Sequence, residues 1–168
     1  LVQINPRYIF FPHWNWKVES EIHQRFECVV FHTAPLPYGR GGSPIQNLIL
    51  NGFSSSPVCA LKMNDTLDSG PIYTSSEILL TGNLSEIFSR LASKVDLLIV
   101  DICTKNPVPI EQVGKVHNFR RLGRSDNEIS STHSLNEIYD RIRMLDSDDY
   151  PNAYIQFGPY TIELTDAE

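Results

Sequence analysis

The stretch that decides the fold runs from residue 8 to residue 32, and two apolar runs bound it: residues 8–11 (YIFF) and residues 28–31 (CVVF). Both runs are continuous and rich in β-prone residues, which is typical of strands buried on both faces. Between them, residues 17–26 carry apolar side chains at helical spacing, which predicts a short crossover helix. A strand, a crossover and a second strand in so short a span predict parallel pairing within an α/β sheet.

Capping signals and turn formers predict most of the remaining elements. Residues 33–43 hold two prolines and three glycines, so we expect no regular structure there. Ser43 and Pro44 are a helix cap and a first helical residue, and Gly52 ends that helix. Asn83 and Ser134 are each followed three residues later by Glu, which indicates two further helix starts.

Strands are expected where apolar residues alternate or cluster between turns. These segments are residues 58–63, 72–80 and 116–119, and a β-hairpin of residues 153–157 and 160–164. Taken with the helices, they predict an α/β fold with a mainly parallel sheet, followed by a small C-terminal helix and hairpin.

Composition sets the class of protein. The chain has 168 residues, of which 41% are apolar, enough for the core of one domain. The three cysteines are not in close pairs, so a disulfide framework and a Cys-based zinc site do not fit, and we expect no metal. With no signal peptide and no long apolar segment, we expect a cytoplasmic protein that does not enter the membrane.

The charge is distributed unevenly along the chain. The net charge is −6, yet residues from Asp126 onward carry ten acidic and two basic residues. This contrast predicts a core of residues 1–124 and an acidic extension of residues 125–168. It also argues against a nucleic-acid partner, because neutralising phosphates needs a clear basic excess. The exception is a basic cluster of Lys115, Arg120, Arg121 and Arg124, which we interpret as a solvated loop.

Three local features could carry chemistry. His32 follows a strand, at the sheet edge where ligands gather in open α/β folds, and imidazole exchanges protons near neutral pH. Asp68 lies in residues 67–71 (LDSGP), and residues 38–44 (YGRGGSP) form a glycine-rich loop before a helix. Taken singly, each has a simpler interpretation: a buried histidine, a turn, and a loop that lacks the phosphate-binding glycine motifs.

In their order and spacing, these features resemble the folate-dependent formyltransferases. The resemblance rests on residues 31–46 (FHTAPLPYGRGGSPIQ), on residues 58–63 (VCALKM) followed by 67–72 (LDSGPI), and on the late segments 142–145 (IRML) and 150–154 (YPNAY). It extends from Tyr8 to about Leu164. It implies a Rossmann-like formyltransferase fold.

The resemblance also implies an activity and a set of site residues. Family members transfer a formyl group from 10-formyltetrahydrofolate to an amine, leaving tetrahydrofolate. His32 matches the catalytic histidine, which would take the amine proton, and Asp68 matches the aspartate that would orient and stabilise the imidazole. The pterin would lie near residues 61–68, with Leu61, Met63, Leu67 and Asp68 as the cofactor-binding candidates.

Two departures from the family pattern accompany the match. Val30 stands where the family has an asparagine that holds the formyl oxygen, and losing such a donor costs about 10²–10³ in rate elsewhere. His13, Asn15 or a backbone N–H could take over that role, or the activity is weak or absent. Only seven residues precede the first strand, so the chain looks truncated or belongs to a short branch.

Known acceptors in the family are glycinamide ribotide, methionyl-tRNA and nucleotide-linked amino sugars. The acidic charge disfavours tRNA and the departures disfavour the purine enzyme, so we expect a small nucleotide-linked amino sugar. Arg40 or the basic cluster would meet its pyrophosphate and Trp14 and Trp16 would stack on a ring, although core packing is the commoner role of Trp. A non-catalytic binding domain, a hydrolase that releases formate, and a homodimer stay open.

Overall fold

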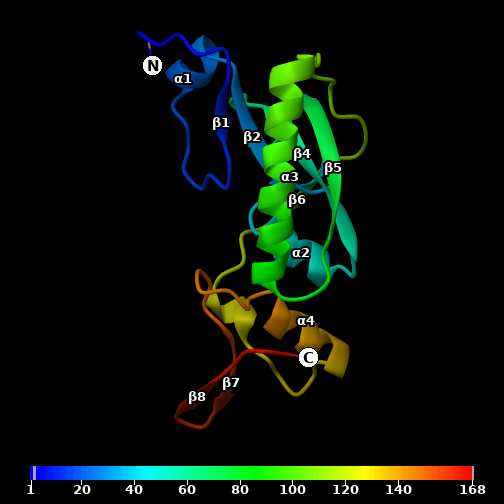
Figure 1. Ribbon diagram of the computed structural model, residues 1–168. Helices are drawn as coiled ribbons and strands as arrows, with labels where there is room; N and C mark the ends of the chain where they lie inside the picture. Colours follow the sequence, from blue (N-terminus) through cyan, green and yellow to red (C-terminus); the bar gives the residue numbers. More distant parts are fainter. Residues whose placement is uncertain (2, 168) are drawn as a thin grey trace.

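A four-stranded sheet forms the centre of the computed structural model, which describes residue 1 and residues 3–167. Its strands are β1 (Ile9–Phe11), β2 (Cys28–Thr33), β4 (Ser55–Lys62) and β5 (Ile72–Leu79), in the order β1-β2-β4-β5 (Figure 1). The predicted α/β architecture is confirmed, and so is the parallel pairing of β1 with β2. The crossover between them contains α1 (Ser20–Arg25), shorter than the predicted helix.

The prediction of a mainly parallel sheet is wrong, because β2 with β4 and β4 with β5 pair antiparallel. The helix between β2 and β4 is α2 (Pro44–Leu50), which has seven residues. Such a helix rises only about 10 Å, less than the roughly 20 Å of a six-residue strand. α2 alone therefore does not return the chain to the start of β2, and β4 runs antiparallel to β2.

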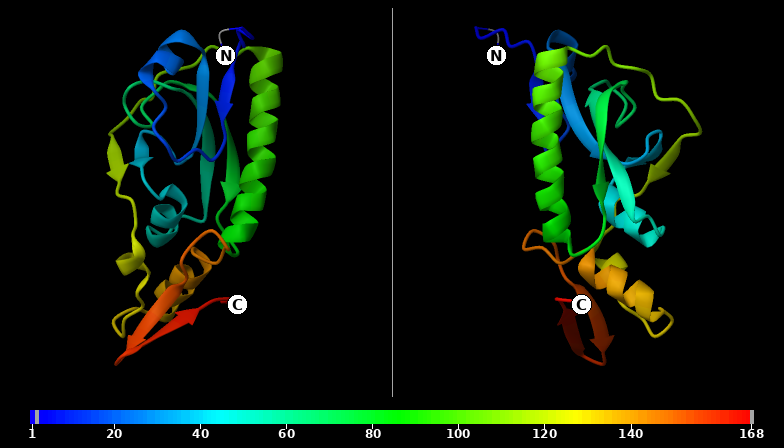
Figure 2. Two further views of the ribbon diagram at one scale, coloured as in Figure 1. Left: turned by 90° about the vertical axis from the view of Figure 1, so that its left-hand side faces the viewer. Right: turned by 45° about the vertical axis from the view of Figure 1, so that its right-hand side comes forward.

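Helices and a small second sheet cover the two faces of the central sheet. The long helix α3 (Leu84–Lys105) lies along one face, and α2 lies on the other side with the two-stranded sheet of β3 (Tyr38–Gly41) and β6 (His117–Phe119) (Figure 2). Val29 of β2 and Ile102 of α3 belong to one buried cluster. Because side chains alternate along a strand, His32 faces the other side, toward β3.

The glycine-rich segment 33–43 contains a regular strand, which corrects the expectation of an irregular loop. β3 pairs in parallel with β6, more than seventy residues further along the chain. Ser43 also differs from its predicted capping role: it is left-handed (φ 48°) and makes no side-chain cap. Its hydroxyl instead accepts a hydrogen bond from the Leu122 amide (3.1 Å), while Pro44 begins the helix as predicted.

The C-terminal segment packs at one end of the sheet (Figure 1). It comprises a 3₁₀ turn (Arg124–Asn127), α4 (Leu135–Arg143) and the hairpin of β7 (Ala153–Phe157) and β8 (Tyr160–Leu164). The capping boxes predicted for α3 and α4 are confirmed. Met144 is fully buried in the same apolar cluster as Leu48 of α2, so this segment shares the core of the rest. None of the described helices is long and apolar enough to cross a membrane.

Candidate active site

His32 and Asp68 come together although they belong to different elements. His32 lies near the end of β2, and Asp68 lies in the loop between β4 and β5. The imidazole Nδ1 is 3.4 Å from the Asp68 carboxylate Oδ2, and the two side chains are only 7% and 9% exposed. A nearly buried imidazole beside a carboxylate is an arrangement suited to proton transfer.

β3 holds both members of this pair. The carbonyl of Gly39 lies 2.7 Å from His32 Nε2, and the amide of Gly41 donates to Asp68 Oδ2 (2.9 Å). A carbonyl oxygen can only accept, so Nε2 carries a proton. In the neutral imidazole the lone pair is therefore on Nδ1, the nitrogen that faces Asp68. The Gly39 carbonyl fixes the tautomer, and the carboxylate is placed to stabilise a proton that arrives on Nδ1.

The glycines of β3 are explained by the close approach of β6. A Cβ on Gly41, which has a left-handed φ of 107°, would lie 2.4 Å from the Phe119 carbonyl oxygen. A Cβ on Gly39 would lie 2.7 Å from the Phe119 ring. Glycine loops can bind anions through backbone N–H groups. Here the anion that meets the Gly41 amide is the carboxylate of Asp68.

Gln112 completes this arrangement, and the sequence analysis missed it. Its Nε2 donates to the carbonyls of Asp68 (2.9 Å) and Gly70 (2.8 Å). Its Oε1 accepts from Nε (3.0 Å) and Nη2 (2.8 Å) of Arg40. Gln112 lies in a segment without periodicity or motif, so no local signal marked it. The hydrogen bonds bring Arg40 into the surroundings of Asp68, and the side chain predicted to bind substrate is already partnered there.

Cys59 is the residue opposite His32 in the pairing of β2 with β4. A cysteine near a histidine can act as a nucleophile when its thiol is easily ionised. Burial, however, raises the pKa of the Cys59 thiol to about 11, and its Sγ donates to the Ala34 carbonyl (3.5 Å). Cys59 therefore remains a protonated packing residue beside the candidate pair.

His13, Trp14 and Asn15 lie away from the pair. The His13 ring packs edge-on against Phe88 of α3, with a centroid distance of 5.2 Å. Trp14 contacts Phe11 and Trp16, and Asn15 is exposed between the two tryptophans. Within residues 3–167, no hydrogen bond or ion pair joins His13 or Asn15 to His32 or Asp68. We expect these three residues to bind substrate, with His13 or Asn15 near the formyl oxygen and Trp14 stacked on a ring, and this stays a prediction.

The cofactor candidates differ in how much of each is accessible. Leu61 is fully buried opposite Val30, and the Met63 amide donates to the Cys28 carbonyl (2.8 Å). Leu67, next to Asp68, is 71% exposed, and Val113, next to Gln112, is 88% exposed. Of the cofactor candidates, Leu67 is therefore accessible to a ligand and Leu61 is not.

Val30 lies two residues before His32 on the same face of β2, where it is half-buried. Its backbone takes part in the ladders with Phe11 of β1 and Leu61 of β4. A valine side chain has no hydrogen-bond donor. His13 packs on α3, on the opposite side of the sheet, so it does not replace the missing amide in this conformation.

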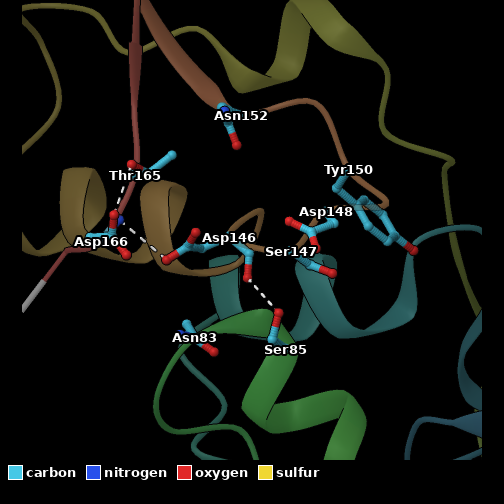
Figure 3. A pocket seen from close by; sticks show the side chains of 9 residues that line it. All are labelled: Asn83, Ser85, Asp146, Ser147, Asp148, Tyr150, Asn152, Thr165 and Asp166. Atoms are coloured by element: carbon cyan, nitrogen blue, oxygen red, sulfur yellow. Dashed lines mark hydrogen bonds between the residues drawn. The ribbon is translucent and has the colours of Figure 1, made fainter.

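An open polar cavity lies far from the pair, at the junction of α3 with the C-terminal segment (Figure 3). Its volume is about 560 Å³, and three aspartates, Asp146, Asp148 and Asp166, line it. Ser85 donates to the Asp146 carbonyl (3.3 Å), and the Asp166 amide donates to the Asp146 carboxylate (3.2 Å). These bonds tie the start of α3 to the chain on both sides of the hairpin, and the cavity includes none of the candidate residues.

The chain is similar to known formyltransferases in sequence and in structure. A family model described as "Methionyl-tRNA formyltransferase, C-terminal domain" matches residues 124–168. A methionyl-tRNA formyltransferase of Campylobacter lari is 30% identical over an alignment that covers 98% of this chain and 55% of the relative. The solved structure of a methionyl-tRNA formyltransferase from Clostridium thermocellum is 44% identical, with a TM-score of 0.94 over 98% of this chain and 73% of that chain.

A more distant structure shares the fold alone. A sugar N-formyltransferase from Shewanella is 21% identical, with a TM-score of 0.75 over 96% of this chain and 69% of that chain. The fold that the sequence resemblance implied is confirmed by these likenesses. The chain spans about half the length of the first curated relatives it matches.

Proposed function

Because the chain belongs to the folate-dependent formyltransferase family, we propose that it transfers a formyl group from 10-formyltetrahydrofolate to a primary amine. The observation that carries the proposal is the convergence of His32 Nδ1 and the Asp68 carboxylate, 3.4 Å apart. These are the two residues that match the catalytic positions of the family. We expect the exposed Leu67, which precedes Asp68, to contact the folate.

The folate supplies the formyl carbon that the amine attacks. His32 takes the proton that the amine loses, on Nδ1, because Nε2 is already protonated toward Gly39. The resulting imidazolium lies between the Gly39 carbonyl and the Asp68 carboxylate, so both of its N–H groups face an acceptor. When bound, the folate would supply the formyl group, and its leaving nitrogen would take up the proton that His32 holds.

For the acceptor, we propose a small nucleotide-linked amino sugar. A tRNA substrate needs a basic surface, and the net charge here is −6. Two of the four members of the basic cluster are ion-paired, Arg120 with Asp126 and Arg124 with Glu163. Methionyl-tRNA is the competing acceptor, because it gives its name to the relatives at 30% and 44% identity.

The acceptor is identified by direct competition. The chain is mixed with 10-formyltetrahydrofolate and either a panel of nucleotide amino sugars or methionyl-tRNA, and the release of tetrahydrofolate is followed. We expect turnover with an amino sugar that does not fall steeply as salt increases. Turnover with methionyl-tRNA alone would overturn the small acceptor but not formyl transfer.

The variant Asp68→Asn tests the catalytic pair. We expect kcat to fall by about 10²–10⁴-fold, because the imidazolium loses its charged neighbour. The Kd for folate should change little, because the variant keeps the size of the side chain. Equal losses in kcat and in folate affinity would mean that Asp68 is only part of a structural turn.

The absence of the family asparagine at Val30 favours a second candidate, a domain that binds folate without catalysis. Folate binding without turnover above that of His32→Ala would support this alternative. Formate release in the absence of any amine would instead indicate a hydrolase that uses the same pair with water as the acceptor.

A further inference from the structure

We propose that Gln112, clamped by Arg40, is a positioning residue that sets the place of the Asp68 carboxylate against His32. The inference rests on the proposed formyl transfer, and it extends the machinery to a residue more than forty positions away in sequence. It also gives Arg40 a role in the site other than the substrate binding predicted from sequence.

Gln112 Nε2 holds the backbone of the Asp68 loop at two points, the carbonyls of Asp68 and Gly70. Asp68 has a left-handed φ of 52°, an uncommon conformation for a residue with a side chain. Such a conformation persists where the surroundings impose it, and the two bonds from Gln112 are part of those surroundings.

Arg40 determines which end of the Gln112 amide faces Asp68. The two guanidinium N–H groups can only donate, so the end they meet must be the oxygen, Oε1. The NH₂ end is then directed at the two loop carbonyls. Arg40 has Gly39 and Gly41 as neighbours in β3, the residues that contact His32 and the Asp68 carboxylate. Three consecutive residues of one strand therefore fix the imidazole, the amide and the carboxylate.

Loss of Gln112 should change the position of the Asp68 carboxylate more than it changes the affinity for folate. Movement of a catalytic group by about 1 Å can cost about 10²-fold in rate. Without Gln112, Asp68 keeps its bond to the Gly41 amide but loses the restraint on its backbone. The carboxylate would then sample positions in which it no longer faces Nδ1.

Two variants test the role. Gln112→Ala removes all four bonds, whereas Gln112→Glu keeps the length and the partner for Arg40 but loses the donor to the loop carbonyls. In both we expect kcat to fall about 10- to 100-fold with KM for folate nearly unchanged. Gln156→Ala is the matched control, because that hairpin amide also uses both ends, toward Gly158 and Thr161, and lies outside the site.

A double-mutant cycle separates positioning from general stability. If Gln112 acts through Asp68, then Asp68→Asn with Gln112→Ala is no slower than Asp68→Asn alone. If Gln112→Ala slows the Asp68→Asn variant as much as it slows the wild type, the proposal is overturned.

A readout without turnover keeps this proposal apart from the proposed function. The imidazole nitrogens of His32 are followed by NMR in the wild type, in Gln112→Ala, in Gln112→Glu and in the Gln156→Ala control. We expect the Nδ1 signal to shift in Gln112→Glu, while Nε2, held by Gly39, stays in place. Unchanged Nδ1 in both Gln112 variants would overturn the role of Gln112 whether or not the chain transfers formyl groups.

Discussion

Gly70 sets the limit on how the loop of Asp68 can be built. A Cβ at this position would lie 1.7 Å from the carbonyl oxygen of Lys62, a backbone atom that cannot move aside easily. The position of this carbonyl is fixed, because Lys62 is the last residue of β4 and its amide donates to the Pro71 carbonyl (2.9 Å). Gly70, which the sequence marks as a turn former, is therefore also needed for the close packing of the Asp68 loop against the end of β4.

We expect Gly70→Ala to lower the free energy of unfolding by about 1–3 kcal/mol, because strand end and loop must separate to admit the methyl group. The activity should fall further than the stability explains, since Asp68 moves with the loop. Urea unfolding and kcat check the two effects. Gly123→Ala is the control, because its added Cβ would have no atom within 4 Å; a similar loss there would contradict the steric explanation.

At the scale of elements, the start of α3 is determined by local contacts, whereas strand β3 is determined by a contact with a distant segment. α3 begins with a complete capping box: Glu86 N donates to Asn83 Oδ1 (2.9 Å) and Asn83 N donates to Glu86 Oε2 (3.1 Å). These bonds are local, so the helix start can be read from four residues. β3, by contrast, exists because β6 lies beside it.

Asn83→Ala should destabilise the protein by about 1 kcal/mol, the usual cost of losing a helix cap. The midpoint of thermal unfolding measures it, with Ser89→Ala on the exposed side of the same helix as the comparison. The site lies on the other face of the sheet, so kcat should be unchanged in Asn83→Ala. A loss of kcat would mean that a shift of α3 changes the geometry of His32 and Asp68.

At the scale of the whole molecule, an ion pair joins the main body to the C-terminal segment. Arg120, just after β6, bonds the Asp126 carboxylate, and Arg141 of α4 donates to the Asp126 carbonyl (2.8 Å). Hydrogen bonds from Arg120 and from the Gly123 amide lower the pKa of Asp126 from 3.8 to about 2. A carboxylate with a lowered pKa in the folded state stabilises the fold in its ionised form.

This pKa fixes the pH range in which the contribution is lost. It is present above about pH 4, where the carboxylate is ionised even in the unfolded chain, and it disappears as the pH falls toward 2. Asp126→Asn should therefore be less stable than the wild type at pH 6 and nearly equal to it near pH 2. Arg120→Gln should reproduce part of this difference. A gap between wild type and Asp126→Asn that is the same at every pH would contradict the assignment.

The sequence by itself determined the elements whose signals are local. The capping boxes of α3 and α4, the hairpin of β7 and β8, and the parallel pair of β1 and β2 all follow from patterns within a few residues or one short crossover. His32 and Asp68 were identified by motif, and their meeting was expected from the family resemblance rather than from physical chemistry.

Only the tertiary structure decided the rest, because those features depend on segments that are far apart in sequence. The pairing of β3 with β6, the bonds of Gln112 to the Asp68 loop, and the packing of His13 on Phe88 each join residues more than forty positions apart. Neither propensity nor periodicity encodes such contacts. They follow from the shape that remains once the helices and strands have packed, and here that shape brings an arginine, a glutamine and two glycines around one imidazole and one carboxylate.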